Sequence, residues 1–256
     1  MSNLGIDNPM NEAVEASKLR EITDSDREDI FIAGYPKSGN TWLQYLLAGA
    51  VYGVNARVAP DSLIQDLVPD VHYKKLYRRY LTPTFFKTHD LPQPHHRKVV
   101  FLVRDGRDVM VSYFHHLTAL GNRLDFLRLV VDGEGLFPCR WHEHIEAWTA
   151  NPHGAELITI SYEMLKRDTV TELKRICDFA RLERERTMLE SVVLNSSFEN
   201  MREREKKFGW SDSVWPKDKA FIRRGKIGSF KDEMPEAVLK EFMEQSESAL
   251  RRLGYV

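Results

Sequence analysis

Residues suited to binding an anion gather in the stretch YPKSGNTW, Tyr35 to Trp42. It follows an apolar run of strand length, Ile30 to Gly34, and precedes an apolar run of helical spacing, so it is predicted to be a strand-to-helix turn. The first N–H groups of a helix have no partner within the helix and carry partial positive charge. The glycine would let the backbone approach an anion, and the lysine, serine and threonine add a charge and two hydroxyl donors. The turn is predicted to hold a phosphate, with a tight turn without ligand as the alternative.

The nearest general template for this turn is the phosphate loop G-x-x-x-x-G-K-[ST]. Gly34 and Gly39 fit its spacing, but Lys37 precedes the second glycine, and Asn40 stands where the template has its lysine. The turn is therefore built like a phosphate loop, but not one of the nucleotide triphosphatase kind.

A second anion site is predicted in the stretch KVVFLVRDGRDVMVSYFHHL. Arg104 directly follows an expected strand, and Ser112 lies eight residues later in the helix that follows. Arginine suits bidentate recognition of phosphate, and a serine two helical turns along can reach the same anion. A cluster of surface ion pairs with the neighbouring aspartates is the alternative.

A candidate base lies in the stretch FFKTHDL, where Lys87 and His89 follow the end of an expected strand. Alternation along an extended segment puts both side chains on one face, so a cation and a base can converge on one reacting centre. Histidine titrates near neutrality and can accept a proton from a hydroxyl group. A surface histidine is the alternative.

The late segment 206–231 is rich in glycine, lysine, arginine and tryptophan and is long for a connection within a domain. It is predicted to be a lid or a binding loop, in which Arg223 and Arg224 followed by Gly225 make another anion clamp. A solvated basic loop is the alternative.

Strand-length apolar runs alternate with segments of helical period, which predicts an α/β fold with a central parallel sheet flanked by helices. Ligands of such sheets bind at the carboxyl ends of the strands, where these motifs lie. We expect an N-terminal segment, 1–29, helical around Asn11 to Glu21 or loose, and a single domain over 30–256. The expected strands are Ile30 to Gly34, Thr84 to Lys87, Lys98 to Val103 and Glu156 to Ser161. The expected helices are Thr41 to Tyr52, Arg107 to Leu117, Trp141 to Ala150, Val170 to Ala180, Arg184 to Asn195 and Pro235 to Leu253.

Composition limits the class of partner. The 256 residues carry 37 basic and 38 acidic side chains, and this net charge of -1 argues against general nucleic-acid binding. No apolar run approaches the roughly 18 residues of a membrane span, and the polar N-terminal segment is not a secretory signal. Cys139 and Cys177 suggest no disulfide framework and suit a reducing compartment. We expect a soluble, cytoplasmic protein with no membrane partner.

These motifs, in this order, resemble those of the cytosolic-type sulfotransferases, which use 3′-phosphoadenosine 5′-phosphosulfate (PAPS). The turn matches the family's YPKSGTTW loop, Lys87 to His89 match its KTH, and Arg223 to Gly225 with Gly228 and Lys231 resemble its RKGxxGxWK segment. The resemblance spans Phe31 to Lys231 and implies the P-loop NTPase-like sulfotransferase fold, without a metal.

The resemblance also implies how PAPS is bound and used, with adenosine 3′,5′-bisphosphate (PAP) as the product. His89 would take the proton from a hydroxyl of the acceptor, and Lys37 would stabilise the bridging oxygen of the leaving phosphate. Lys87 would neutralise charge on the sulfuryl group, and Ser112 would restrain Lys37. The 5′-phosphosulfate would contact Lys37, Ser38, Gly39, Asn40 and Thr41. The 3′-phosphate would contact Arg104, Ser112, Arg223, Arg224 and Gly225. The adenine would contact Trp42, Phe198, Tyr162, Ser196 and Met201.

Some positions depart from the family pattern. Asn40 replaces a threonine and keeps a polar donor, Arg224 replaces a lysine, and Ser229 and Phe230 replace Asp-Trp. The family's dimerisation pattern, K-x-x-x-T-V-x-x-x-E, is broken after Lys231, so that dimer is not predicted and the oligomeric state stays open.

Two other functions stay open from the residues alone. A P-loop small-molecule kinase would need a carboxylate-held Mg²⁺, for which Asp105 is the candidate, and its activity would stop in excess EDTA. A non-catalytic nucleotide-binding protein would not need His89 as a base. Metal-based hydrolysis is disfavoured, because His142 and His144 lie two apart on a helix and do not share a face.

The acceptor is predicted only as a small molecule with a hydroxyl group, or less readily an amine. Its pocket is expected to draw on 54–82 and 118–140, where aromatic side chains suit a phenol, a sterol-like alcohol or another apolar compound. Ordinary core residues are the alternative. These aromatic residues are Tyr73, Tyr77, Tyr80, Phe126 and Phe137, alongside Tyr113 and Phe114.

Overall fold

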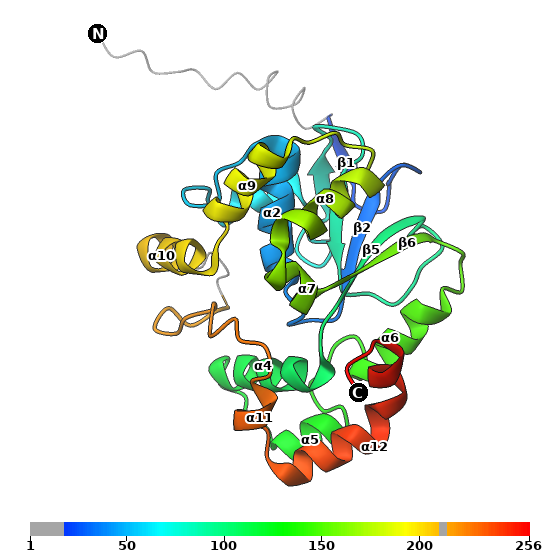
Figure 1. Ribbon diagram of the computed structural model, residues 1–256, viewed down its shortest axis with the longest axis vertical. Coiled ribbons are helices and arrows are strands. Elements are labelled where there is room, and N and C mark those ends of the chain that lie inside the picture. Colours follow the sequence, from blue (N-terminus) through cyan, green and yellow to red (C-terminus); the bar gives the residue numbers. More distant parts are fainter. Residues whose placement is uncertain (1–17, 210–213) are drawn as a thin grey trace.

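The computed structural model describes residues 18–209 and 214–256. At its centre is a four-stranded parallel sheet in the order β4-β2-β5-β6 (Figure 1). The strands are β2 (Ile30–Gly34), β4 (Phe85–Thr88), β5 (Lys98–Val103) and β6 (Glu156–Ser161). The predicted α/β class is confirmed, and β4 lies one residue later than the sequence suggested.

The strands form where they do because both faces of the sheet are apolar. In β2, Ile30 and Ile32 point into one core cluster, and Phe31 and Ala33 into the other. This alternation follows from the two-residue period of a strand and continues in β5, so the central strands are buried on both sides.

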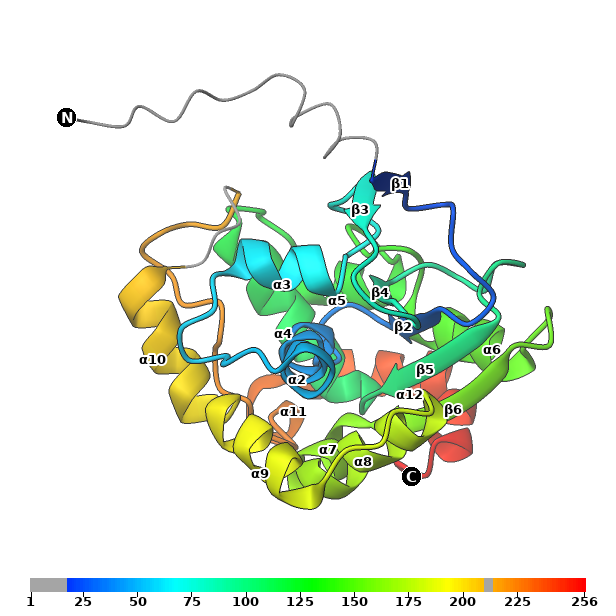
Figure 2. The same cartoon turned by 90° about the horizontal axis from the view of Figure 1, so that it is seen from above.

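Helices cover both faces of this sheet. In Figure 2, α2 is seen nearly end-on, while Figure 1 shows α4, α5, α11 and α12 grouped below the sheet. The first core cluster is completed by α2 (Asn40–Tyr52), α3 (Asp61–Leu67), α7 (Tyr162–Arg167), α8 (Thr169–Phe179) and α9 (Arg186–Asn195). The second is completed by α4 (Gly106–Ala119), α5 (Phe126–Val131), α6 (Trp141–Ala150), α11 (Phe230–Glu233) and α12 (Glu236–Arg252).

The position of β2 defines the functional edge of the sheet. The next strand of the sheet in the chain, β4, pairs with one side of β2, and the following strand, β5, pairs with its other side. The connections therefore diverge at the carboxyl end of β2, which is where open α/β sheets bind ligands. The turn after β2, His89 after β4, Arg104 after β5 and Tyr162 after β6 all lie at this edge.

Some elements differ from the sequence prediction. Strands β1 (Leu19–Glu21) and β3 (Leu76–Arg78) form a small antiparallel sheet that was not predicted. The helix expected around Asn11 to Glu21 is therefore wrong for its last residues, which form β1. Residues 11–17 lie outside the described residues. Helices α3, α5, α7 and α11 were missed because each has seven residues or fewer.

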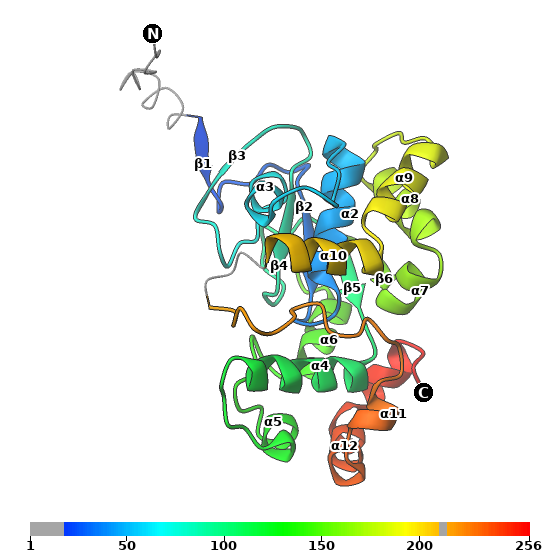
Figure 3. The same cartoon turned by 90° about the vertical axis from the view of Figure 1, so that its left-hand side faces the viewer.

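Helix α10 (Phe198–Phe208) covers the first residues of the predicted late loop. Its highly charged sequence hides a buried side made by Met201 and Arg204. Figure 3 shows the segment between residue 214 and α11 running between α10 and α4. Residues 210–213 of the predicted loop lie outside the described residues. No helix in the described part of the chain is long and apolar enough to cross a membrane.

A buried carboxylate ties the segment before β2 to the strands beside it. Asp29 accepts hydrogen bonds from both terminal nitrogens of Arg79, at 2.8 and 2.6 Å, and from the backbone N–H of Thr84 at 2.9 Å. Because the side chain of Asp29 is fully buried, its loss would leave the Arg79 guanidinium without its main counter-charge.

We therefore expect Asp29→Ala to lower the free energy of unfolding by about 3–5 kcal/mol, measured by urea denaturation. The control is Asp66→Ala, which removes an exposed ion pair with Lys74 and should cost no more than about 1 kcal/mol. Equal losses in the two variants would contradict the assigned role of Asp29.

Candidate active site

A cavity of about 970 Å³ opens at the carboxyl edge of the sheet. It is lined by the turn between β2 and α2, the end of β4, one side of α4, the start of α10 and the segment 221–229. Ser38 and Ser196 are buried behind the wall rather than part of it. The predicted site residues that line the cavity are Lys37, Gly39, Asn40, Thr41, Trp42, Lys87, His89, Arg104, Ser112, Tyr162, Phe198, Met201, Arg223, Arg224 and Gly225.

The turn after β2 exposes backbone N–H groups because of its unusual conformation. Lys37 and Gly39 have φ values of 70° and 101°, both in the left-handed region. A side chain at Gly39 would also collide with the Tyr162 ring, 2.6 Å from the Cβ position. Gly39 is the N-cap of α2 and offers no side-chain acceptor, whereas Asp105 and Asp168 cap α4 and α8. The first N–H groups of α2 therefore suit an anionic ligand.

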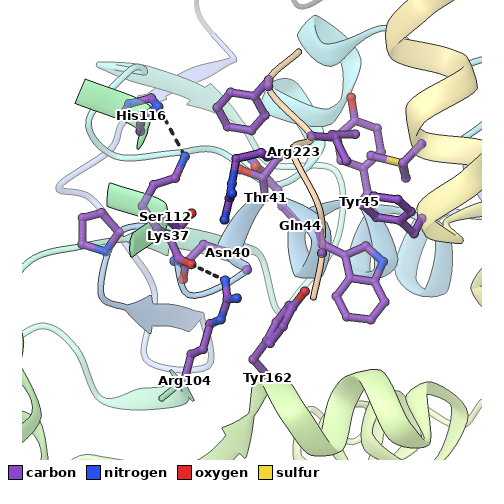
Figure 4. A pocket seen from close by; sticks show the side chains of 18 of the residues that line it. Lys37, Asn40, Thr41, Gln44, Tyr45, Arg104, Ser112, His116, Tyr162 and Arg223 are labelled. Atoms are coloured by element: carbon purple, nitrogen blue, oxygen red, sulfur yellow. Dashed lines mark hydrogen bonds between the residues drawn. The ribbon is translucent and has the colours of Figure 1, made fainter. Parts of the chain in front are cut away.

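Three side chains hold the carbonyl groups of this turn. His89 Nδ1 donates to the Gly34 carbonyl at 2.6 Å. Asn40 Nδ2 donates to the Tyr35 carbonyl at 2.9 Å. Arg104 Nη1 donates to the Lys37 carbonyl at 3.1 Å (Figure 4). One of the two Nδ2 protons of Asn40, the side-chain donor predicted for the phosphosulfate, is therefore used inside the turn.

The ammonium group of Lys37 lies among neutral groups. It contacts His116 Nδ1 at 3.3 Å and lies 4.6 Å from the centre of the Phe221 ring (Figure 4). Burial, and then the positive charges of Lys87, Arg104 and Arg223, lower the pKa of Lys37 to about 7. Burial and Lys37 likewise lower the pKa of His116 to about 3, so this imidazole is neutral and accepts the lysine's hydrogen bond.

The predicted 3′-phosphate site is a group of cations held by protein partners. Arg223 and Arg224 both bind the carboxylate of Glu233, at 2.5 and 2.7 Å. Although burial would raise the pKa of Glu233, these two hydrogen bonds lower it to about 2. Arg104 lies 4.4 Å from the centre of the Tyr162 ring, and its Nε is buried without a hydrogen-bond partner among the described residues.

The predicted base and its neighbour have different surroundings. Lys87 donates to Asp70 at 2.6 Å in a buried ion pair. Since the Gly34 carbonyl can only accept, Nδ1 of His89 carries the proton and Nε2 keeps its lone pair. Burial, and then the charge of Lys87, lower the pKa of His89 to about 3. His89 is therefore a neutral imidazole at physiological pH.

Aromatic side chains form the side of the cavity predicted for adenine. The rings of Trp42 and Tyr162 meet at 73° with their centres 6.0 Å apart, and Phe198 packs against Gly225. Ser196 contributes through its carbonyl, which accepts from Trp42 Nε1 at 2.8 Å.

The aromatic residues predicted for the acceptor pocket lie in different places. Tyr73, Tyr113 and Phe137 line the cavity. Tyr77 and Phe126 instead belong to the second core cluster, and Phe114 stacks on Phe126 with ring centres 4.4 Å apart. Tyr80 packs on Tyr52, away from the cavity.

Comparison with known proteins decides the family. The model of the sulfotransferase domain family matches residues 27–254. The chain belongs to the sulfotransferase family. It is 30% identical to sulfotransferase 2A1 of Rattus norvegicus over 245 residues, which cover 85% of this chain and 84% of that protein. It is 23% identical to sulfotransferase 1E1 of Mus musculus over 250 residues, which cover 88% and 84%.

Solved structures share the fold of this sulfotransferase. Retinol dehydratase in a complex with retinol and PAP has a TM-score of 0.67 at 23% identity, covering 88% of this chain and 82% of that one. Mouse sulfotransferase SULT7A1 complexed with PAP has a TM-score of 0.65 at 20% identity, covering 90% and 86%. The predicted fold and the predicted enzyme class, a PAPS-dependent sulfotransferase, are confirmed.

Sequence reasoning missed several residues of the sulfotransferase site. His116 lies one helical turn after Ser112 on α4, so helical spacing could have placed both on one face. Asp70 and His72 lie 17 residues before Lys87 and His89, the residues they contact. Glu233 lies just after the late motif, 10 residues from Arg223.

The residues that the alternative functions would need are engaged elsewhere. Asp105 caps α4 and pairs with Arg107 at 2.8 Å. His142 contacts Ser246, while His144 is buried against the Tyr35 ring. Among the described residues, no three histidine, cysteine or acidic side chains are grouped as metal ligands.

The lowered pKa of Lys37 predicts proton uptake when PAP binds. At pH 8, above its pKa of about 7, most Lys37 side chains are neutral, and the phosphates of PAP would favour the charged form. We expect about one proton taken up per site at pH 8, and affinity that falls as pH rises above 7. Calorimetric titration in buffers of different ionisation enthalpy measures the uptake.

Lys37→Met should abolish this proton uptake, while Lys240→Met, on the exposed face of α12, should retain it. A binding enthalpy that does not depend on the buffer in the unmodified enzyme would contradict the assignment of the titrating group.

Proposed function

We propose that this sulfotransferase transfers the sulfuryl group of PAPS to a hydroxyl group of a small molecule, with His89 as general base and Lys37 stabilising the leaving phosphate. The observation that carries the proposal is the 2.6 Å hydrogen bond between His89 Nδ1 and the Gly34 carbonyl. Gly34 ends β2 immediately before the phosphate turn, so the base is fixed to the backbone that would hold the group being transferred.

The residues around the cavity fit both ends of PAPS. When bound, PAPS supplies a sulfuryl group on its 5′-phosphate, and that phosphate stays with the nucleotide. The N–H groups from Gly39 to Thr41 would bind the 5′-phosphosulfate, and Arg104, Arg223 and Arg224 the 3′-phosphate. The buried Arg104 Nε, which has no hydrogen-bond partner among the described residues, supports an anion at this place. Trp42 and Phe198 would stack on the adenine, with Tyr162 beside them.

His89 would act through its Nε2. The acceptor hydroxyl would donate a hydrogen bond to this nitrogen and pass it the proton as the oxygen attacks sulfur. A pKa of about 3 is low for a base, but its causes are burial and the nearby Lys87 charge. A bound polyanion would oppose that positive charge and raise the pKa of His89 toward the working pH.

Lys37 would supply the charge that the leaving phosphate needs. It lies within the turn, so its ammonium group can reach the bridging oxygen by leaving His116, which holds it at 3.3 Å. Catalysis of this kind depends on positioning and on charge stabilisation rather than on a covalent intermediate. Ser112, on the same side of the cavity as His116, would restrain Lys37 (Figure 4).

The acceptor is proposed as an apolar alcohol or phenol, and less readily an amine. Tyr113 and Phe137 line the cavity and would suit the apolar body of an acceptor. Retinol dehydratase has been crystallised with androsterone and with retinol, and a relative from Oryctolagus cuniculus, 24% identical, is an amine sulfotransferase. A relative from Danio rerio is named cytosolic sulfotransferase 1, and we expect this enzyme to act in the cytoplasm as well.

His89→Ala tests the proposed base. With the acceptor chosen as the compound in a panel of phenols, sterols and primary alcohols that releases most PAP, we expect kcat to fall by roughly 10²–10⁴. PAP affinity should fall far less than kcat, because His89 contacts the phosphate turn through a single hydrogen bond, to the Gly34 carbonyl. The control is His153→Ala, at an exposed loop residue, which should keep full activity.

Unchanged sulfuryl transfer in His89→Ala would show that the base is another group. PAP binding without transfer to any member of the panel by the unmodified enzyme would instead favour a non-catalytic nucleotide-binding protein.

A further inference from the structure

A short segment before β3 runs beside the end of β4. Asp70 and Lys87 form an isolated parallel bridge, in which the Lys87 N–H donates to the Pro69 carbonyl at 2.8 Å and the Val71 N–H donates to the Lys87 carbonyl at 3.0 Å. The chain then turns away, because the N–H groups of residues 73 and 74 both donate to the Asp70 carbonyl. The backbone ladder therefore ends before it reaches the N–H of His89.

A side chain takes over at this point. The His89 N–H donates to Nε2 of His72 at 3.1 Å, and the two imidazole rings stack at 9° with their centres 5.6 Å apart. The rings of Phe137 and His72 form a T-shaped pair, with an interplanar angle of 87° and centres 5.2 Å apart. His72 thus replaces the backbone acceptor that the ladder no longer supplies.

The same segment also holds the predicted catalytic lysine. The Asp70 carboxylate accepts from the His72 N–H at 3.0 Å through one oxygen and from Lys87 Nζ at 2.6 Å through the other. Asp70, in the bridge, and His72, in the turn that follows it, are two residues apart, and each holds one residue of the Lys87–His89 pair. We call 70–72 the clamp.

The hydrogen bond fixes the state of His72. Nε2 can accept from an N–H group only with its lone pair, so the proton is on Nδ1 and the ring is neutral. With Nε2 protonated, His72 could no longer accept, and Asp90, 3.8 Å away, would be its nearest carboxylate.

We propose that His72 is a positioning residue for the transfer reaction, which holds the backbone of His89 so that the imidazole stays anchored to Gly34 with Nε2 toward the acceptor. The inference rests on the proposed function, in which His89 is the base. His72 acts through the His89 N–H and takes no proton from the acceptor.

Two variants separate the hydrogen bond from the ring. His72→Phe keeps an aromatic ring for stacking but removes the acceptor, whereas His72→Gln removes the ring but keeps an acceptor oxygen at similar reach. We expect His72→Phe to lower kcat roughly tenfold to a hundredfold, with the KM for PAPS changed less than about twofold. His72→Gln should keep kcat within about threefold of the unmodified enzyme.

The His89 amide gives a readout that does not depend on activity. In intact enzyme labelled with ¹⁵N-histidine, NMR should show solvent exchange of the His89 amide proton accelerated by roughly tenfold in His72→Phe and little changed in His72→Gln. Unchanged exchange and kcat in His72→Phe, or an equal loss of kcat in both variants, would overturn the proposal. Failure of His89 as base is seen separately, as full activity in His89→Ala.

Discussion

The site depends on how the carbonyl groups of one turn are occupied. Between β2 and α2, the Gly34 carbonyl accepts from His89, which follows β4. The Tyr35 carbonyl accepts from Asn40, which begins α2. The Lys37 carbonyl accepts from Arg104, which follows β5. At the same turn, the first N–H groups of α2 have no partner within the helix and are left for an anion. The same bonds fix the predicted base and a predicted phosphate ligand to the turn, so anion binding and proton transfer share one scaffold.

The charges around this turn are not equivalent. Three of the cations have a carboxylate close by. Lys87 lies 2.6 Å from an oxygen of Asp70, and Arg104 lies 3.6 Å from one of Asp108. Arg223 lies 2.5 Å from an oxygen of Glu233. The ammonium of Lys37 contacts instead a neutral imidazole and an aromatic ring, and its pKa is lowered to about 7. A new negative charge nearby stabilises the charged form of a cation most where the existing partners of the cation are neutral. That suits Lys37 to a leaving phosphate and suits the arginines to a phosphate that stays bound.

The sequence predicts the parts of the site that are local. The turn, the strand ends and the residues after them are contiguous stretches whose types and spacing carry their chemistry, so Lys37, His89 and Arg104 could be placed at one edge of the sheet. The clamp and Glu233 could not be predicted, because the folded chain, and not the local sequence, brings them to the residues they contact. An aromatic residue type does not tell whether the side chain lines a cavity or packs in the core. Of the residues predicted for a cavity wall, Tyr113 lines the cavity, whereas Phe126 lies in the second core cluster. Short elements such as α3 and β1 form against tertiary partners that no local pattern reveals.

We propose that the turn and the arginines bind two separate phosphates of one nucleotide. Calorimetric titration with PAP, adenosine 5′-monophosphate, adenosine 3′-monophosphate and ATP with Mg²⁺ distinguishes two phosphate sites from one. We expect PAP to bind roughly a hundredfold more tightly than either monophosphate and than ATP with Mg²⁺, because only PAP would engage both sites. Equal affinity for PAP and adenosine 5′-monophosphate, or tighter binding of ATP with Mg²⁺, would contradict it.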